Sequence, residues 1–268
     1  MAVTLHTTDI RGQLVFLGTG TSVGVPMIGC GCDVCTSSNT RNQRTRCGLA
    51  IGLPEGNLLI DTTPDLRQQL LRERIGVAHA VAFTHDHADH VFGLDDVRVF
   101  FFYLGRPLPI FCEDSVEERL RKSFDYAFTP EAASYAGGVP QVVFQRISAG
   151  LPFDVLGARV TPLRLHHGRF RVLGFRIGNV AYCTDTNHIP PESVPLLAGL
   201  DVLILDALRA RPHVSHFSLQ QAIEVAQLIG AKRTLFTHMG HELEHEATNA
   251  ALPAGMELAY DGLRLELT

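Results

Sequence analysis

Short apolar runs separated by turn residues recur along the whole chain and predict a succession of β-strands. The runs carry the branched and aromatic residues typical of strands, and Gly, Pro, Asn or Asp stands between them. We predict strands at Gln13–Thr19, Cys47–Leu53, Leu58–Asp61, Ala80–Thr84, Val142–Arg146, Ala158–Leu165, Gly174–Ile177, Val180–Cys183, Val202–Leu205 and Arg233–Thr237, and a hairpin around Asp261-Gly262.

Helical spacing of apolar residues is found in three further segments, where N-cap residues or Pro and terminal Gly support the assignment. The predicted helices are Ser218–Ile229 followed by Gly230, Pro64–Arg74 followed by Gly76, and Ser115 to about Asp125. Strands dominate the first half, and no repeat or long linker interrupts the chain. We therefore predict one domain over residues 1–268, with stacked sheets and helices on their outer faces.

Composition excludes several classes of protein. The 268 residues are 46% hydrophobic and 19% charged, as in a globular domain, and the net charge of -5 disfavours a broad nucleic-acid or membrane surface. No apolar run approaches the roughly 20 residues needed to cross a bilayer, and Met1–Arg11 has polar residues where a signal peptide is apolar. We expect a cytoplasmic protein and, since dimers are the commonest assembly, a homodimer.

Residues able to bind metals follow four of the predicted strands. They are His85-Asp86-His87-Ala88-Asp89-His90 after Thr84, His166-His167 after Leu165, Thr184-Asp185 after Cys183, and His238 after Thr237. In an extended segment residues two apart face the same side, so His85 and His87 could bind one ion. A turn at Ala88 would direct Asp89 and His90 to a second ion. A solvated turn is the alternative, but such a polar burst directly after a buried-looking strand makes it the weaker interpretation.

The pattern His-x-His-x-Asp-His, with a later His, an Asp in a Thr-Asp-Thr setting and a final Thr-His, resembles that of the metallo-β-lactamase-fold hydrolases over essentially the whole chain. The resemblance implies an α/β fold, a four-layer αββα sandwich, with two metal ions. The implied ligands are His85, His87 and His167 for the first ion, Asp89, His90 and His238 for the second, and Asp185 as the bridge. His166 competes with His167. The family also has an Asp where Asp61 stands, which would accept an imidazole N–H.

A second cluster consists of three cysteines at the spacing Cys30-x-Cys32-x-x-Cys35. Three thiolates within six residues predict a zinc knuckle over residues 29–36, and a closed zinc site needs a fourth ligand. Cys47 and His241 are the candidates. Cys47 would serve equally well as a core thiol.

A narrower resemblance joins this knuckle to the Gly18-Thr19-Gly20-Thr21 turn, the His85–His90 segment and Thr237-His238-Met239-Gly240-His241. Together these motifs resemble the PhnP-type phosphodiesterases of the carbon-phosphorus lyase pathway. The resemblance implies that His241 completes the structural zinc site with Cys30, Cys32 and Cys35. It also implies a phosphoric diester hydrolase that acts on small cyclic diesters such as phosphoribosyl cyclic phosphate or cyclic nucleotides.

Charge balance gives a separate argument for the substrate. Two divalent ions, Asp89, Asp185 and a bridging hydroxide sum to about +1, which a monoanionic phosphodiester would neutralise. We expect the hydroxide to attack phosphorus and Asp89→Ala to abolish the reaction. Imidazole and carboxylate ligands suit zinc and manganese alike.

The loop from Asp206 to Ser218 is rich in groups that bind anions. By resemblance, His216 lies near the scissile phosphate and would stabilise charge or protonate the leaving oxygen. The alternative is that His216 only helps to cap the following helix. Arg209 and His213 are further candidate phosphate contacts.

Two other functions are compatible with the same motifs. A tRNA 3'-end processing nuclease is disfavoured by the net charge and by the lack of a basic Gly-rich arm. A non-catalytic biosynthetic accessory protein is disfavoured by the complete ligand set. The aromatic run from Phe100 to Tyr103 is expected in the core or at a subunit contact.

Overall fold

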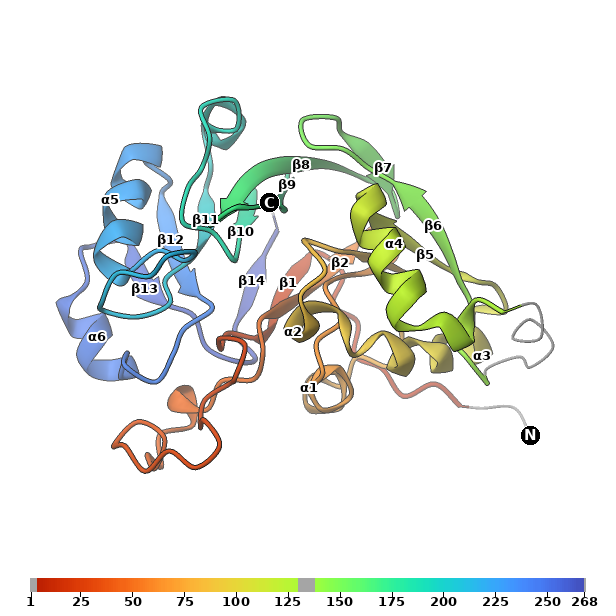
Figure 1. Ribbon diagram of the computed structural model, residues 1–268, viewed down its shortest axis with the longest axis horizontal. Coiled ribbons are helices and arrows are strands. Elements are labelled where there is room, and N and C mark those ends of the chain that lie inside the picture. Colours follow the sequence, from red (N-terminus) through yellow and green to blue (C-terminus); the bar gives the residue numbers. More distant parts are fainter. Residues whose placement is uncertain (1–3, 130–137, 268) are drawn as a thin grey trace.

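Two seven-stranded sheets form the centre of the computed structural model, which describes residues 4–129 and 138–267 (Figure 1). The first sheet has the order β14-β1-β2-β3-β4-β5-β6 and the second the order β13-β12-β11-β10-β9-β8-β7. The strands of the first sheet are β1 (Gln13–Gly18), β2 (Gly48–Leu53), β3 (Gly56–Ile60), β4 (Ala80–Ala82), β5 (Leu108–Cys112), β6 (Val142–Arg146) and β14 (Arg264–Glu266). Those of the second are β7 (Phe153–Val155), β8 (Ala158–His167), β9 (Phe170–Ile177), β10 (Val180–Cys183), β11 (Val202–Asp206), β12 (Arg233–Thr237) and β13 (Met256–Leu258).

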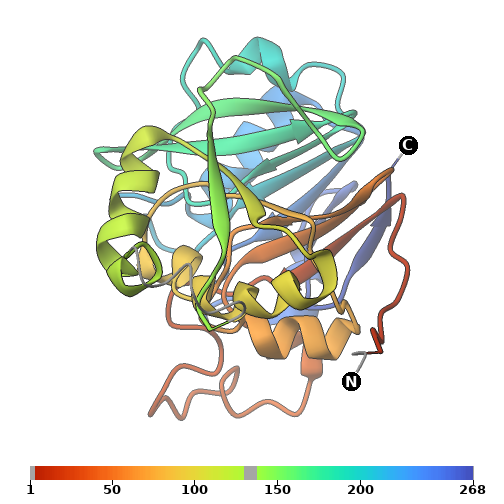
Figure 2. The same ribbon diagram turned by 90° about the vertical axis from the view of Figure 1, so that its right-hand side faces the viewer.

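Helices cover the outer faces of the two sheets, as the two views show (Figures 1 and 2). On the side of the first sheet lie α1 (Leu66–Glu73), α2 (Ala88–Val91), α3 (Phe100–Leu104) and α4 (Asp114–Ser123), with the 3-10 turns η1 (Thr40–Asn42), η2 (Leu94–Val99) and η3 (Asp125–Ala127) in the same half of the chain. On the side of the second lie α5 (Leu219–Ile229) and α6 (His245–Ala251), with η5 (Val194–Leu197). The predicted four-layer αββα sandwich is confirmed.

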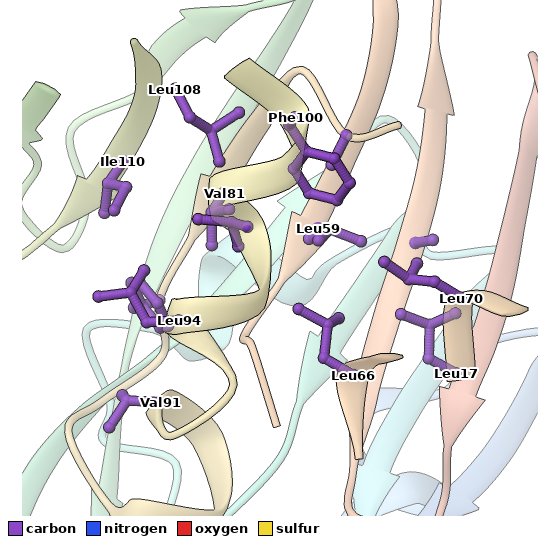
Figure 3. Packing of buried hydrophobic residues seen from close by; sticks show 14 of the residues in the cluster. Leu17, Leu59, Leu66, Leu70, Val81, Val91, Leu94, Phe100, Leu108 and Ile110 are labelled. Carbon is purple, nitrogen blue, oxygen red and sulfur yellow. The ribbon is translucent and has the colours of Figure 1, made fainter. Parts of the chain in front are cut away.

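Alternation along the strands explains the layers. In β2, Leu49 and Ile51 face the second sheet, whereas Ala50 faces the helices. In β12, Leu235 packs between the sheets and Phe236 packs under α5. The outer cluster of the first sheet joins side chains of α1, α2, η2 and α3 to the strands (Figure 3). Because central strands are buried on both faces, they read as continuous apolar runs.

The helix signals are accurate to within a few residues. Ser218 caps α5 with a capping box to Gln221, and Gly230 ends the helix at φ 69°. The helix predicted at Pro64–Arg74 is α1 and ends at Glu73, because Arg74 takes the left-handed C-cap conformation at φ 55°. Phe100 packs in the core, but Phe102 is 59% exposed. No helix in the described residues is long and apolar enough to span a membrane.

The predicted C-terminal hairpin is wrong. Strand β13 pairs in parallel with β12 in the second sheet, whereas β14 pairs antiparallel with β1 in the first. The intervening Asp261-Gly262 segment therefore crosses between the sheets. The Asp261 carboxylate accepts hydrogen bonds from Thr19 and Thr45, contacts that a local turn signal does not reveal.

Candidate dinuclear metal centre

The predicted metal-binding residues meet where strands from both sheets end. Strands β10, β11 and β12 are parallel, and β8 runs in the same direction because β9 is antiparallel to β8 and β10. Their carboxyl ends therefore lie at one edge and carry His167, Asp185 and His238. The segment after β4 brings His85–His90 from the other sheet. The candidate site thus lies where the carboxyl ends of β8, β10 and β12 in the second sheet meet the segment that follows β4 in the first.

The first group consists of His85, His87, His167 and Asp185, whose potential ligand atoms all lie within 4.8 Å of one another. The ring centroids of His85 and His87 are 4.5 Å apart, and those of His87 and His167 are 5.0 Å apart. His85 and His87 flank the half-buried Asp86 in the segment between β4 and α2. His166 lies instead against His188, at 5.4 Å between rings.

The second group consists of Asp89, His90, Asp185 and His238. The Nε2 atom of His90 is 3.2 Å from Asp185 Oδ1, and that of His238 is 3.4 Å from the same oxygen. The other oxygen, Oδ2, is 3.8 Å from His85 Nε2 in the first group. Asp185 therefore presents one oxygen to each group, which is the geometry of a bridging carboxylate.

Hydrogen bonds at the far side of the imidazoles fix which nitrogen is free. His90 Nδ1 donates to Asp61 Oδ2 at 2.7 Å, and His167 Nδ1 donates to the Ser215 carbonyl at 2.8 Å. The Thr84 hydroxyl donates to Asp61, so its oxygen can accept from His85 Nδ1 at 2.9 Å. These partners occupy the Nδ1 atoms and leave the Nε2 atoms facing the centre, where they can bind a metal ion.

Three buried imidazole Nε2 atoms have no hydrogen-bond partner among the described residues. They belong to His85, His90 and His238. Such atoms are costly unless something binds them. Burial and the neighbouring His90 lower the pKa of His85 well below its usual value, which favours the neutral, ligating form. The donor set therefore fits two divalent ions.

The backbone is strained at three of these positions. Asp61, Asp185 and His238 have φ values of 67°, 50° and 58° without being glycine. Left-handed backbone at a non-glycine residue costs free energy and persists where the surroundings impose it. The three residues follow the ends of β3, β10 and β12; Asp185 and His238 belong to the candidate ligand groups, and Asp61 accepts a hydrogen bond from His90.

His216 lies between the two groups of ligands. Its ring stacks on His238 at 4.7 Å and meets His167 edge-on at 4.5 Å. Its Nδ1 donates to Asp206 Oδ2 at 2.6 Å. Burial alone would lower the pKa of His216, but the Asp206 carboxylate outweighs burial and raises it to about 9. The ring is therefore fixed in orientation and favours the protonated form.

The loop arginine and His213 occupy different positions. The guanidinium of Arg209 donates to the carbonyls of Arg211 and Pro212 in its own loop, at 3.2 and 3.0 Å. His213 lies beside His216, with ring centroids 5.2 Å apart. Of these two candidate phosphate contacts, His213 therefore lies against the central histidines, whereas Arg209 donates within its own loop.

The cysteine knuckle forms a separate group with His241. The Nδ1 atom of His241 lies 3.2, 3.3 and 3.5 Å from the sulfurs of Cys30, Cys32 and Cys35. Cys47, the other candidate, contacts the hydroxyls of Tyr182 and Thr237 in the core, and burial raises its pKa to about 11. The structure therefore assigns His241 and not Cys47 to the knuckle.

Sequence reasoning missed Asp206 and Ser215. Asp206 is the last residue of β11 and orients His216, while the Ser215 carbonyl orients His167. An acidic residue that ends an apolar strand is a signal for Asp206, since it matches Asp61 at the end of another strand. A backbone carbonyl such as that of Ser215 leaves no signal in the sequence.

Several known proteins are similar to this chain in sequence or fold. An octanoyltransferase of Porphyromonas gingivalis is 37% identical over 94% of the chain, although the chain spans only 51% of that protein. A coenzyme PQQ synthesis protein B of a Methylobacterium species is 37% identical over 95% of the chain and all of the relative. The crystal structure of a diphosphatase from the PhnP family is 42% identical, covers 94% of this chain and 96% of its own, and has a TM-score of 0.88.

The family assignment rests on the larger part of the chain. The model of the β-lactamase superfamily domain matches residues 56–239, which include every residue of the two metal-binding groups. The PhnP-family structure shares the whole fold, so the predicted resemblance is confirmed. The chain belongs to the β-lactamase superfamily and has the metallo-β-lactamase fold.

Proposed function

We propose that this hydrolase-fold protein is a metal-dependent phosphoric diester hydrolase for small, including cyclic, phosphodiesters. The observation that carries the proposal is Asp185, whose two oxygens face two separate groups of ligand atoms. Two adjacent ions are the arrangement that suits displacement at phosphorus. The likeness to a PhnP-family diphosphatase supports phosphorus chemistry.

The chain supplies His85, His87 and His167 for one ion and Asp89, His90 and His238 for the other, with Asp185 shared. Zinc or manganese would supply Lewis acidity and a water nucleophile at neutral pH. The protein's own contribution is to hold the Nε2 atoms in place through Asp61, Thr84 and Ser215. Two ligand carboxylates leave the centre positively charged, which favours an anionic diester.

His216 is the proposed proton donor. It is held by Asp206 and lies against rings of both ligand groups, so it is positioned to donate a proton or a hydrogen bond to the leaving oxygen. Asp206 accepts from Nδ1, which leaves the Nε2 proton available for donation. The cysteine knuckle is proposed to hold a structural zinc through Cys30, Cys32, Cys35 and His241.

A biosynthetic accessory role is the second candidate, because the PQQ synthesis relative matches along its full length. It predicts bound metal without turnover of phosphodiesters. The octanoyltransferase match gives no comparable support, since half of that protein lies outside the match.

Metal content and turnover test the proposal together. The purified protein loaded with zinc or manganese should hold about three ions per chain and cleave bis(p-nitrophenyl) phosphate. Asp89→Ala should lose an ion of the dinuclear centre and nearly all turnover. Asp86→Asn, which changes a carboxylate of the same segment that pairs with Arg119, should keep all the ions.

Two results would decide against the phosphodiesterase. A fully loaded protein that is inert on a broad panel of phosphodiesters would favour the accessory role. Equal metal contents in the Asp89→Ala and Asp86→Asn variants would refute the assignment of the second ligand group.

A further inference from the structure

The two candidate metal sites share one short segment of the chain. His238 belongs to the second group of the dinuclear centre, and His241, three residues later, belongs to the cysteine knuckle. Three residue steps span at most about 11 Å, so the same stretch of backbone holds both histidines. A shift of this segment would therefore displace a ligand of each site.

Main-chain hydrogen bonds fix this segment to two other parts of the fold. The Met239 N–H donates to the Thr19 carbonyl at 2.8 Å, just after β1. The Gly240 N–H donates to the Leu208 carbonyl at 2.7 Å, in the loop that follows β11. The carbonyl of Gly240 has a different partner, which comes from the knuckle.

That partner is Arg44, which lies at the base of the knuckle loop. The backbone N–H and carbonyl of Arg44 exchange hydrogen bonds with Val25, at 2.7 and 2.8 Å, and this pair closes the loop that carries the three cysteines. The loop projects away from the two sheets and is coloured red to orange in Figure 1. The knuckle loop therefore contacts the shared segment twice, through its cysteines at His241 and through the arginine at its base.

The buried guanidinium of Arg44 binds the shared segment on both sides of His241. Its Nη1 donates to the Gly240 carbonyl at 2.9 Å, and its Nη2 donates to the Leu243 carbonyl at 2.6 Å. The planar guanidinium holds its donors in a fixed geometry. A lysine at this position would keep the charge, but its single ammonium could not reproduce this pair of contacts.

We propose that Arg44 is a positioning residue that couples the two metal sites, so that an ion in the cysteine knuckle strengthens metal binding at the group that contains His238. An ion bound by the cysteines and His241 orders the knuckle loop and the arginine at its base. Because Arg44 binds Gly240, the backbone of His238 is ordered as well, and the dinuclear centre loses less conformational entropy when it binds metal. The inference concerns metal binding and goes beyond the proposed hydrolysis.

Titration with cobalt(II) tests the coupling, because the two sites differ in their absorption. Thiolate ligands give sulfur-to-cobalt charge-transfer bands, which imidazole and carboxylate ligands do not give. The metal-free protein first receives one equivalent of zinc, which soft thiolates select, and is then titrated with cobalt. The double variant Cys30→Ala/Cys32→Ala has no knuckle ion, and its dinuclear centre should bind cobalt about ten-fold more weakly, within the usual range of coupling between sites.

Arg44→Lys shows whether the arginine is needed for the coupling. In this variant the filled and the empty knuckle should give the same cobalt affinity at the dinuclear centre, so the effects of Arg44→Lys and of the double cysteine substitution should not add. A general loss of stability would lower both affinities and leave their ratio unchanged. Arg41→Gln is the matched control, because Arg41 lies on the same loop but contacts Glu246 and Tyr260. It should keep the full difference.

The reverse measurement needs no substitution at Arg44, because coupling between two binding sites is reciprocal. In Asp89→Ala, which is expected to lose an ion of the dinuclear centre, a cobalt-loaded knuckle should lose its charge-transfer band at about ten-fold lower free chelator than in the wild type. If Arg44→Lys does not fold, this comparison still tests the coupling.

Neither measurement depends on turnover, so a protein that cleaves no phosphodiester would refute the proposed function and still decide this inference. Equal cobalt affinities with a filled and an empty knuckle would overturn it. A difference that persists in Arg44→Lys would also overturn it, since the arginine would then not be the connection.

Discussion

Asp61 connects both groups of ligands through one buried carboxylate. It is 1% exposed and accepts hydrogen bonds from the Thr84 N–H, the Thr84 hydroxyl and His90 Nδ1. The Thr84 hydroxyl in turn contacts His85. A single residue that binds no ion therefore sets the orientation of one histidine in each group.

Asp61→Ala should weaken metal binding by about 10- to 100-fold, the usual effect of removing a partner that orients a ligand. Titration of the metal-free protein with zinc, followed by competition with a chelator, measures the change. Thr84→Val should also lower the metal affinity of the group that contains His85.

Asp65→Asn provides a comparison, because Asp65 lies in the same loop but pairs with Arg46. Its metal affinity should match that of the wild type. An unchanged affinity in Asp61→Ala would contradict the role given to Asp61.

The candidate ligands could be predicted because each stands at or shortly after a recognisable strand end. His85 and His87 alternate in one short segment, and Asp89 and His90 follow in α2. The partners of these ligands depend on contacts between distant segments. Ser215, for example, is 48 residues from His167 in sequence.

At the scale of elements, the segment between β12 and α6 wraps around a buried arginine. Arg44 is 1% exposed and donates to the carbonyls of Gly240 and Leu243, at 2.9 and 2.6 Å. Burial lowers its pKa to about 10, so it stays cationic at neutral pH. Arginine is mostly found at the surface, so the sequence pattern does not predict that Arg44 is buried.

His245, the first residue of α6, should make stability depend on pH. Burial, with Arg44 nearby, lowers its pKa in the folded protein, whereas the unfolded chain keeps a value of about 6.5. Between these two values only the unfolded chain binds the proton. The free energy of unfolding should therefore fall as pH falls below about 6.5, by at most about 1.4 kcal/mol per pH unit.

Urea denaturation from pH 7.5 down to 5.5 measures this effect. Because metal-binding histidines also respond to pH, the quantity of interest is the difference between the wild type and His245→Gln. The variant should lose less stability on acidification. Parallel curves for the two proteins would show that His245 contributes nothing to the pH dependence.

At the scale of the molecule, the chain passes twice between the sheets, from β6 to β7 and from β13 to β14. The second passage is fixed by Asp261, which accepts from the N–H and hydroxyl groups of Thr19 and Thr45 and pairs with Arg72 at 3.1 Å. Asp-Gly is a strong local signal for a hairpin, but these partners come from far along the chain. The layered architecture can be predicted from the pattern of apolar residues. The sheet to which a short strand such as β14 belongs cannot, because it depends on contacts with distant residues.

Asp261→Ala should lower the free energy of unfolding by about 3 kcal/mol, since it leaves buried donors without an acceptor. Thermal and urea denaturation measure the loss. Asp154→Ala, an exposed substitution on β7, should stay within about 0.5 kcal/mol of the wild type. Equal effects of the two substitutions would contradict the importance of this passage.

The pairing of β1 has a consequence for synthesis of the protein. One edge of β1 pairs with β2, but the other pairs with β14, which the ribosome makes about 250 residues later. Until then that edge is an open template for other strands. The carbonyl of Thr19, just after β1, also accepts from the N–H of Met239, next to the candidate ligand His238. The nascent chain therefore carries this open edge until β14 has been made, and the candidate metal centre can be completed only after His238 has been made.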